Sequence, residues 1–263
     1  MNTVKPMKPR ALPALMLATL AMLATLLAVA PNVRADEVSV AVAANFAGPL
    51  TKITEGFTAA TGYTLKVSAG STGKFYSQIV AGAPFEVLIA ADDETPKKLI
   101  AEGLAVQGSN FTYAIGKLVL WSAQPGYVDD QGAVLAAGKF AHLAVANPKL
   151  APYGQAGMEV LKARGLADAI TPKLVTAESI AQAYQFVATG NAELGFVALS
   201  QVATPGKPVI GSYWLIPASL YGEIRQDAVL LKTGAKNPAA AALLAYLKSA
   251  PAKAVIQAYG YGH

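Results

Sequence analysis

The chain has 263 residues, enough for one large domain or for two lobes of about 100 residues each. It contains no cysteine, which excludes disulfide bonds and thiolate metal sites, so an apolar core has to hold the fold. The formal net charge is +5, but residues 1–35 carry four basic and no acidic residues, which leaves 17 basic and 16 acidic residues elsewhere. Because these basic residues are scattered, the charge pattern argues against nucleic-acid binding.

The first predicted element is an export signal. Three basic residues precede an apolar stretch at 11–30, and Val33-Arg34-Ala35 offers a small-residue cleavage site. We therefore expect residues 1–35 to be a signal peptide and the exported chain to begin at Asp36. The apolar stretch is long for a signal, so an uncleaved anchor stays open as an alternative.

Strand-like and helix-like segments then alternate, which is the pattern of an α/β fold. The apolar runs at 87–91 and 143–146 are typical of strands in mostly parallel sheets that helices cover on both faces. The predicted strands are 38–43, 64–68, 86–91, 118–122, 142–147, 193–197, 209–215 and 225–232. The predicted helices are 47–60, 73–81, 94–102, 154–164, 178–188 and 237–258.

The last strand and helix can return to the first half of the chain, which predicts two lobes joined by two crossings. We place these crossings near 112–116 and 219–223. The predicted lobes are 36–115 with 223–263, and 116–222. Open parallel sheets bind ligands beyond the carboxyl ends of their strands, so the ligand is expected between the lobes.

Two turns between a strand and a helix are predicted anion sites. The segment 68–74, Ser-Ala-Gly-Ser-Thr-Gly-Lys, places backbone N–H groups and hydroxyls at a helix start, where an anion is stabilised. Asn45 is a capping-type residue in a similar position after the first strand. In the second lobe, 147–154 and 176–180 also end at helix starts. Such a set of turns suggests one shared ligand.

The turn at 68–74 also resembles the end of a nucleotide-binding P-loop, which is an alternative for it. A P-loop requires glycine at position 68, where this chain has Ser68, and a hydroxyl residue after Lys74, where it has Phe75. A glycine-rich turn that binds nothing is the other alternative.

Six motifs together resemble the periplasmic molybdate-binding proteins, the receptor components of ABC importers for tetrahedral oxyanions. They are Val-Ala-Val-Ala-Ala-Asn at 40–45, Ala-Gly-Ser-Thr-Gly-Lys at 69–74, Gly-Ala-Pro-Phe-Glu-Val-Leu-Ile-Ala-Ala-Asp at 82–92, Leu-Ala-Val-Ala-Asn-Pro at 143–148, Pro-Tyr-Gly at 152–154 and Tyr-Gly-Tyr at 259–261. The resemblance covers nearly all of the exported chain. It implies a two-lobed periplasmic binding protein of type II, located in the periplasm, with molybdate or tungstate as ligand and no cofactor. It also implies a membrane permease as partner and a monomeric receptor.

The resemblance further implies which residues hold the oxyanion. By position they are Asn45, Ser71, Tyr153 and Ile180, which donate through side chains or through backbone N–H groups without a paired cation. Tyr153 is expected to use its N–H, with or without its phenol. Ile180 is expected to use its N–H alone.

Some members of that family carry hydroxyls that this chain lacks. Ala44 and Ala198 stand where those members have threonine and tyrosine, respectively. Thr72, Ser39 and the Tyr153 phenol are the candidates to replace these donors.

Three other functions remain as alternatives. One is a binding protein for another tetrahedral oxyanion, such as sulfate. A second is an exported α/β enzyme using Asp92 and Asp93, although carboxylates before a helix typically cap it. The third is iron capture by tyrosines, which here lack nearby carboxylate or histidine partners in the sequence.

Overall fold

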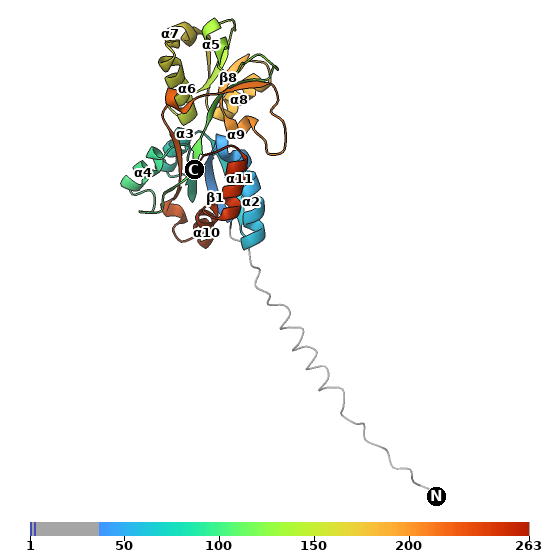
Figure 1. Ribbon diagram of the computed structural model, residues 1–263. Coiled ribbons are helices and arrows are strands. Elements are labelled where there is room, and N and C mark those ends of the chain that lie inside the picture. Colours follow the sequence, from blue (N-terminus) through green and yellow to red (C-terminus); the bar gives the residue numbers. More distant parts are fainter. Residues whose placement is uncertain (2, 4–36, 263) are drawn as a thin grey trace. The chain divides into compact units, whose positions relative to one another are not determined.

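The computed structural model describes Met1, Thr3 and residues 37–262. The rest of the predicted signal peptide and Asp36 lie outside these residues. The described chain forms two five-stranded sheets, each with its own helices (Figure 1).

The first sheet has the strand order β2-β1-β3-β10-β4. Strand β1 pairs in parallel with β2 and β3, whereas β10 is antiparallel to β3 and to β4. The strands are β1 (Glu37–Ala43), β2 (Thr64–Gly70), β3 (Val87–Ile89), β4 (Phe111–Gly116) and β10 (Ile224–Leu230). Only β10 therefore runs against the other strands of this sheet.

The second sheet has the order β7-β6-β8-β5-β9 and repeats this pattern. Strand β6 is parallel to β7 and β8, whereas β5 is antiparallel to β8 and β9. The strands are β5 (Leu118–Ser122), β6 (Leu143–Ala146), β7 (Leu174–Ala177), β8 (Leu194–Ala198) and β9 (Ser212–Leu215). The predicted two-lobed α/β fold with mostly parallel sheets is confirmed.

Helices flank both sheets, and helices from the two ends of the described chain lie together. The C-terminal α11 packs beside α2 in the first lobe, as Figure 1 shows in red and blue. The first sheet carries η1 (Ala44–Phe46), α2 (Ala47–Thr61), α3 (Thr72–Val80), α4 (Glu94–Ala101), η4 (Lys232–Gly234), α10 (Pro238–Leu247) and α11 (Ala250–Ala258). The second carries α5 (Ala133–Ala137), α6 (Pro152–Ala163), α7 (Ala167–Ile170), η2 (Thr171–Lys173), α8 (Ile180–Ala188), α9 (Leu199–Val202) and η3 (Ala218–Leu220).

The sequence of β1 explains why it lies at the centre of the first lobe. Successive side chains of a strand point to opposite faces of its sheet. Val40 and Val42 accordingly join the core on one face, whereas Ala41 joins the core on the other. Both faces are covered, so an uninterrupted apolar strand is stable at this position.

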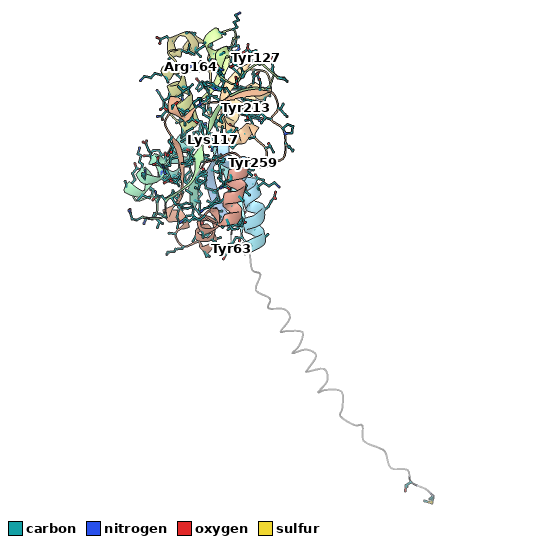
Figure 2. The ribbon with its side chains drawn as sticks, viewed as in Figure 1. Tyr63, Lys117, Tyr127, Arg164, Tyr213 and Tyr259 are labelled. Atoms are coloured by element: carbon teal, nitrogen blue, oxygen red, sulfur yellow. The ribbon has the colours of Figure 1, made fainter. Side chains whose placement is uncertain are left out.

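Several predicted elements differ from those observed. The single helix expected at 237–258 is two helices bent by 58°, because Ser249 caps a new helix. The crossing expected near 112–116 follows directly after these residues, which belong to β4. The chain passes to the second sheet at Lys117, at the level where the two lobes meet (Figure 2). Strand β7 was not predicted.

Phe57 lies in the apolar core of the first lobe, so its replacement measures how much that core contributes to the free energy of unfolding. Its ring is fully buried in α2 and lies 5.7 Å from the ring of Tyr246. Phe57→Ala leaves a cavity, so we expect the free energy of unfolding to fall by about 3–5 kcal/mol. Urea denaturation measures this change. Val67→Ala, at a side chain that is 44% exposed, is the control, and a similar small loss in both variants would contradict the assignment.

Candidate functional site

A small cavity lies between the two sheets, with walls from both lobes. Its volume is about 10 Å³. Its lining is Ala43, Ala44, Asn45, Gly70, Ser71, Thr72, Ala91, Ala151, Pro152, Tyr153 and Ile180. The fold thus brings the four predicted site residues to one place, although they are separated by up to 135 positions in the chain. Within residues 37–262, no charged side chain contributes to this lining.

Three helices begin at the cavity. Ser71 immediately precedes α3, Tyr153 is the second residue of α6, and Ile180 is the first residue of α8. The N–H groups in a first helical turn have no acceptor inside the helix. They also carry the positive end of the helix dipole. The cavity is therefore surrounded by backbone donors that favour negative charge.

Ser71 places a hydroxyl at this cavity. Strand β2 continues to Gly70, so the turn is tighter than the sequence suggested and Ser71 directly joins strand to helix. Its backbone is extended, but its side chain makes no capping hydrogen bond. The residue is 4% exposed, and its Oγ atom has no hydrogen-bond partner. This hydroxyl is free to bind a ligand.

Asn45 is also buried at the cavity wall, with 2% of its surface exposed. The prediction that it caps a helix is wrong, because it lies inside η1 and its side chain bonds residues distant in sequence. Its Nδ2 donates to Gln226 Oε1 at 2.9 Å and to Tyr261 Oη at 3.0 Å. Its Oδ1 has no partner. Among the described residues, this oxygen and Ser71 Oγ are the two buried side-chain polar atoms without a partner.

Tyr153 contributes to the cavity through its backbone. Its phenol is fully buried and accepts a hydrogen bond from Gln226 Nε2 at 2.9 Å. This bond joins α6 of the second lobe to β10 of the first. Pro152 precedes it at the first helical position, where a missing N–H costs nothing. The phenol is thus engaged by protein, and the N–H is the available donor.

The structure places Ala44, Thr72 and Ala198 in different surroundings. Ala44 and Thr72 line the cavity, and Thr72 Oγ1 accepts from Ala91 N at 3.0 Å. Ala198 is fully buried and is not part of the lining. Its N–H donates to Gln201 Oε1, and Gln201 Nε2 donates to Ile180 O at 3.1 Å. The Ala198 backbone therefore helps to fix the start of α8.

Four residues around Asn45 were not predicted as part of the site: Tyr113, Ser200, Gln226 and Tyr261. Tyr261 Oη and Ser200 Oγ each lie 2.9 Å from Asn45 O, and Tyr113 Oη lies 2.9 Å from Gln226 Oε1. Tyr261 is known from the sequence only as part of the motif at 259–261. A polar Gln226 inside a buried strand is the one sequence signal that could have indicated the network.

Direct bonds also join the lobes beside the cavity. Gly73 N donates to Leu150 O at 2.9 Å, and Lys74 forms an ion pair with Glu178. A Cβ atom at position 73 would lie 2.9 Å from Leu150 Cα, so the close approach requires glycine. Lys74 is therefore engaged across the lobes and is not part of the cavity lining.

Asp92 and Asp93 have structural roles at the start of α4. Asp92 accepts from Thr95 N at 2.7 Å and from the Thr95 hydroxyl at 3.2 Å, whereas Asp93 pairs with Lys97. Burial raises the pKa of Asp92. Asp92 therefore caps the start of α4, and Asp93 is engaged in an ion pair on the same helix. Within the described ranges, no group of three His, Asp or Glu side chains could hold a metal ion.

Comparison with known proteins identifies the class. Residues 38–262 match the family of bacterial extracellular solute-binding proteins, and the chain belongs to this family. It is 62% identical to the molybdate-binding protein ModA of Azotobacter vinelandii, over 87% of this chain and 91% of that protein. It is 54% identical to ModA of Rhodobacter capsulatus, over 91% and 93% of the two chains.

Solved structures agree with this assignment. The periplasmic molybdate-binding protein of Azotobacter vinelandii superposes with a TM-score of 0.84 and 45% identity, covering 86% of this chain and 99% of that one. The predicted resemblance to periplasmic molybdate-binding proteins is confirmed. These relatives are binding proteins, so the enzyme alternative is set aside.

The buried phenols near the cavity predict a pH effect on stability. Burial raises the pKa of Tyr113, Tyr153 and Tyr261. Above about pH 10 the unfolded chain loses protons that these phenols keep, so the folded state binds more protons there. The free energy of unfolding should then fall as pH rises above about 10, by up to about 1.4 kcal/mol per pH unit for each tyrosine.

Urea denaturation from about pH 9 to about pH 11 measures this slope. In Tyr113→Phe the free energy of unfolding should fall less steeply with pH, by up to about 1.4 kcal/mol per pH unit, because one buried phenol is missing. Ser122→Ala removes a buried hydroxyl that bonds Glu193 O, and it should keep the original slope. Equal slopes in wild type and Tyr113→Phe would contradict the burial effect.

Proposed function

We propose that this chain is a periplasmic receptor that captures molybdate, or tungstate, between its lobes and delivers it to the membrane permease of an ABC importer. The observation that carries the proposal is the cavity where three helix starts meet two buried polar atoms without partners. The names of the close relatives support the choice of ligand. Residues 1–35 would direct export, and the receptor would act as a monomer without nucleic acid.

The donors at the cavity suit a doubly charged anion without a counter-charge. Each helix start contributes typically 0.3–1 kcal/mol to the binding of a negative charge, and up to about 2 kcal/mol in partly buried sites. Hydrogen bonds to a charged acceptor are roughly twice as strong as neutral ones. We propose Asn45, Ser71, Tyr153 and Ile180 as the residues that bind the anion, with Thr72 as a further donor. Ala44 and Ala198 supply no hydroxyl.

Selectivity would come from size and from protonation. Molybdate and tungstate have longer metal–oxygen bonds than the bonds in sulfate, so a cavity sized for them leaves sulfate out of reach of some donors. Phosphate is partly protonated near neutral pH and requires an acceptor for its proton. Within residues 37–262 no carboxylate lines the cavity to accept that proton.

The lobes of this receptor are proposed as 36–115 with 223–263, and 116–222. The division is supported by the two sheets, because β10 returns to the first sheet after β9 ends the second. Closure of the lobes about the two passages would bury the anion and create the surface that the permease recognises.

Ligand identity is tested by thermal denaturation of the exported chain. A ligand that binds only the folded state stabilises it by about 4.1 kcal/mol at a thousand times its dissociation constant. We expect molybdate and tungstate to raise the melting temperature, and phosphate and ferric citrate to leave it unchanged. A rise with sulfate alone would refute the molybdate assignment.

Ser71→Ala tests the proposed contact directly. Loss of a hydrogen bond to a charged ligand costs about 1.5–3 kcal/mol, so molybdate should bind roughly 10- to 150-fold more weakly. Isothermal titration calorimetry measures the affinity. Ser77→Ala is the matched control, because this exposed serine on α3 bonds Gly73 O and not the cavity. Equal affinity in Ser71→Ala and wild type would remove Ser71 from the site.

A further inference from the structure

We propose that Gln226 is a positioning residue that decides which atom of Asn45 faces the anion. The inference rests on the proposed function, because it concerns how an unprotonated oxyanion is recognised. In the arrangement observed, both hydrogens of Asn45 Nδ2 are used, by Gln226 Oε1 and by Tyr261 Oη. The atom left for a ligand is Oδ1, which accepts and cannot donate.

An unprotonated oxyanion needs a donor at that position. Turning the Asn45 amide alone would place its oxygen against Gln226 Oε1, so two acceptors would meet at 2.9 Å. The two amides must therefore turn together. Exchange of nitrogen and oxygen in both leaves the space that they fill unchanged.

The turned pair removes a conflict at Tyr113. Gln226 Nε2 would donate to Asn45 Oδ1 and to Tyr113 Oη, both across contacts of 2.9 Å. In the observed arrangement, Tyr113 Oη lies 2.9 Å from Gln226 Oε1 and 2.8 Å from Ala90 O. Both atoms are acceptors, and the phenol has one hydrogen to donate. After the turn it would accept from Gln226 and donate to Ala90 O, so both contacts become hydrogen bonds.

The remaining phenols permit the same change. Tyr153 Oη would donate to Gln226 Oε1 across 2.9 Å. Tyr261 Oη would give its hydrogen to Asn45 Oδ1 across 3.0 Å in place of Asn45 O, and Asn45 O would keep the hydrogen bond from Ser200 Oγ at 2.9 Å. A phenol can donate or accept, whereas a carboxylate could only accept. Burial raises the pKa of these tyrosines, so their protons remain available near neutral pH. Asn45 Nδ2 would then occupy the position of the unpartnered oxygen.

The orientation of this pair would set the specificity of the site. With Asn45 Oδ1 toward the ligand, the site offers an acceptor, which suits a protonated oxyanion such as hydrogen phosphate. With Nδ2 toward the ligand, it offers donors alone, which suits molybdate, tungstate or sulfate. Gln226 is fully buried on β10 and bonds Asn45 in its own lobe and Tyr153 in the other, so its orientation is linked to the contact between the lobes.

A double-mutant cycle tests the coupling, with sodium molybdate as the ligand in calorimetric titrations. Gln226→Met removes the amide and keeps the volume, and we expect at least tenfold weaker binding. Asn45→Ala should weaken binding as well. In the double variant, the change at Gln226 should add no further loss, because it acts only through Asn45. Additive losses would overturn the proposal, and Ser122→Ala should leave the affinity unchanged.

Neutron diffraction from deuterated wild-type crystals with molybdate tests the same point without a variant. Deuterons on Asn45 that point at the anion, with deuterons on Gln226 that point at Asn45 Oδ1, would support the proposal. Gln226 with its oxygen toward Asn45 would overturn it. Wild-type protein that binds no molybdate would refute the proposed function itself, whereas binding with an additive cycle would refute the role of Gln226 alone.

Discussion

The hydrogen bonds of Gln226 to Asn45 and Tyr153 join the two lobes at the wall of the cavity. Asn45, Tyr153 and Gln226 are buried there, and a buried polar group without a partner costs about 1–3 kcal/mol. The fold meets this constraint with a network of amides and phenols from both sheets. It leaves two atoms unpaired, on Asn45 and Ser71, and both belong to residues that line the same cavity. The other lining residues surround these two unpaired atoms.

Neutral donors allow such a site to be small and to lack charged side chains. A buried lysine or arginine beside the anion would itself have to be desolvated, which costs several kcal/mol before any attraction is gained. Helix starts avoid this cost, because their N–H groups are fixed in place by the helices. The charged pair of Lys74 and Glu178 lies instead at the surface between the lobes, where solvent screens it and where it contributes little to stability.

The sequence predicted much of this arrangement because its signals are local. Glycine, hydroxyl residues and proline between a strand and a helix identify a helix start wherever the two lobes happen to lie. All four predicted site residues accordingly line the cavity. Two of the errors concern contacts between distant segments, because the reversed β10 and the role of Tyr261 depend on partners that are far away in the chain. The break at Ser249 is local, because this serine accepts a hydrogen bond from Ala252 N at the start of the next helix.

By itself, the sequence determined the α/β alternation, the positions of the helix starts and the resemblance to molybdate-binding proteins. Each of these follows from the order of neighbouring residues. The tertiary structure alone decided that Asn45 is held by Gln226 and Tyr261 and does not cap a helix. It also decided that the Tyr153 phenol bonds protein and that Lys74 pairs across the lobes. The reason is physical: a side chain with several possible partners is committed only when the two sheets meet and water leaves the space between them.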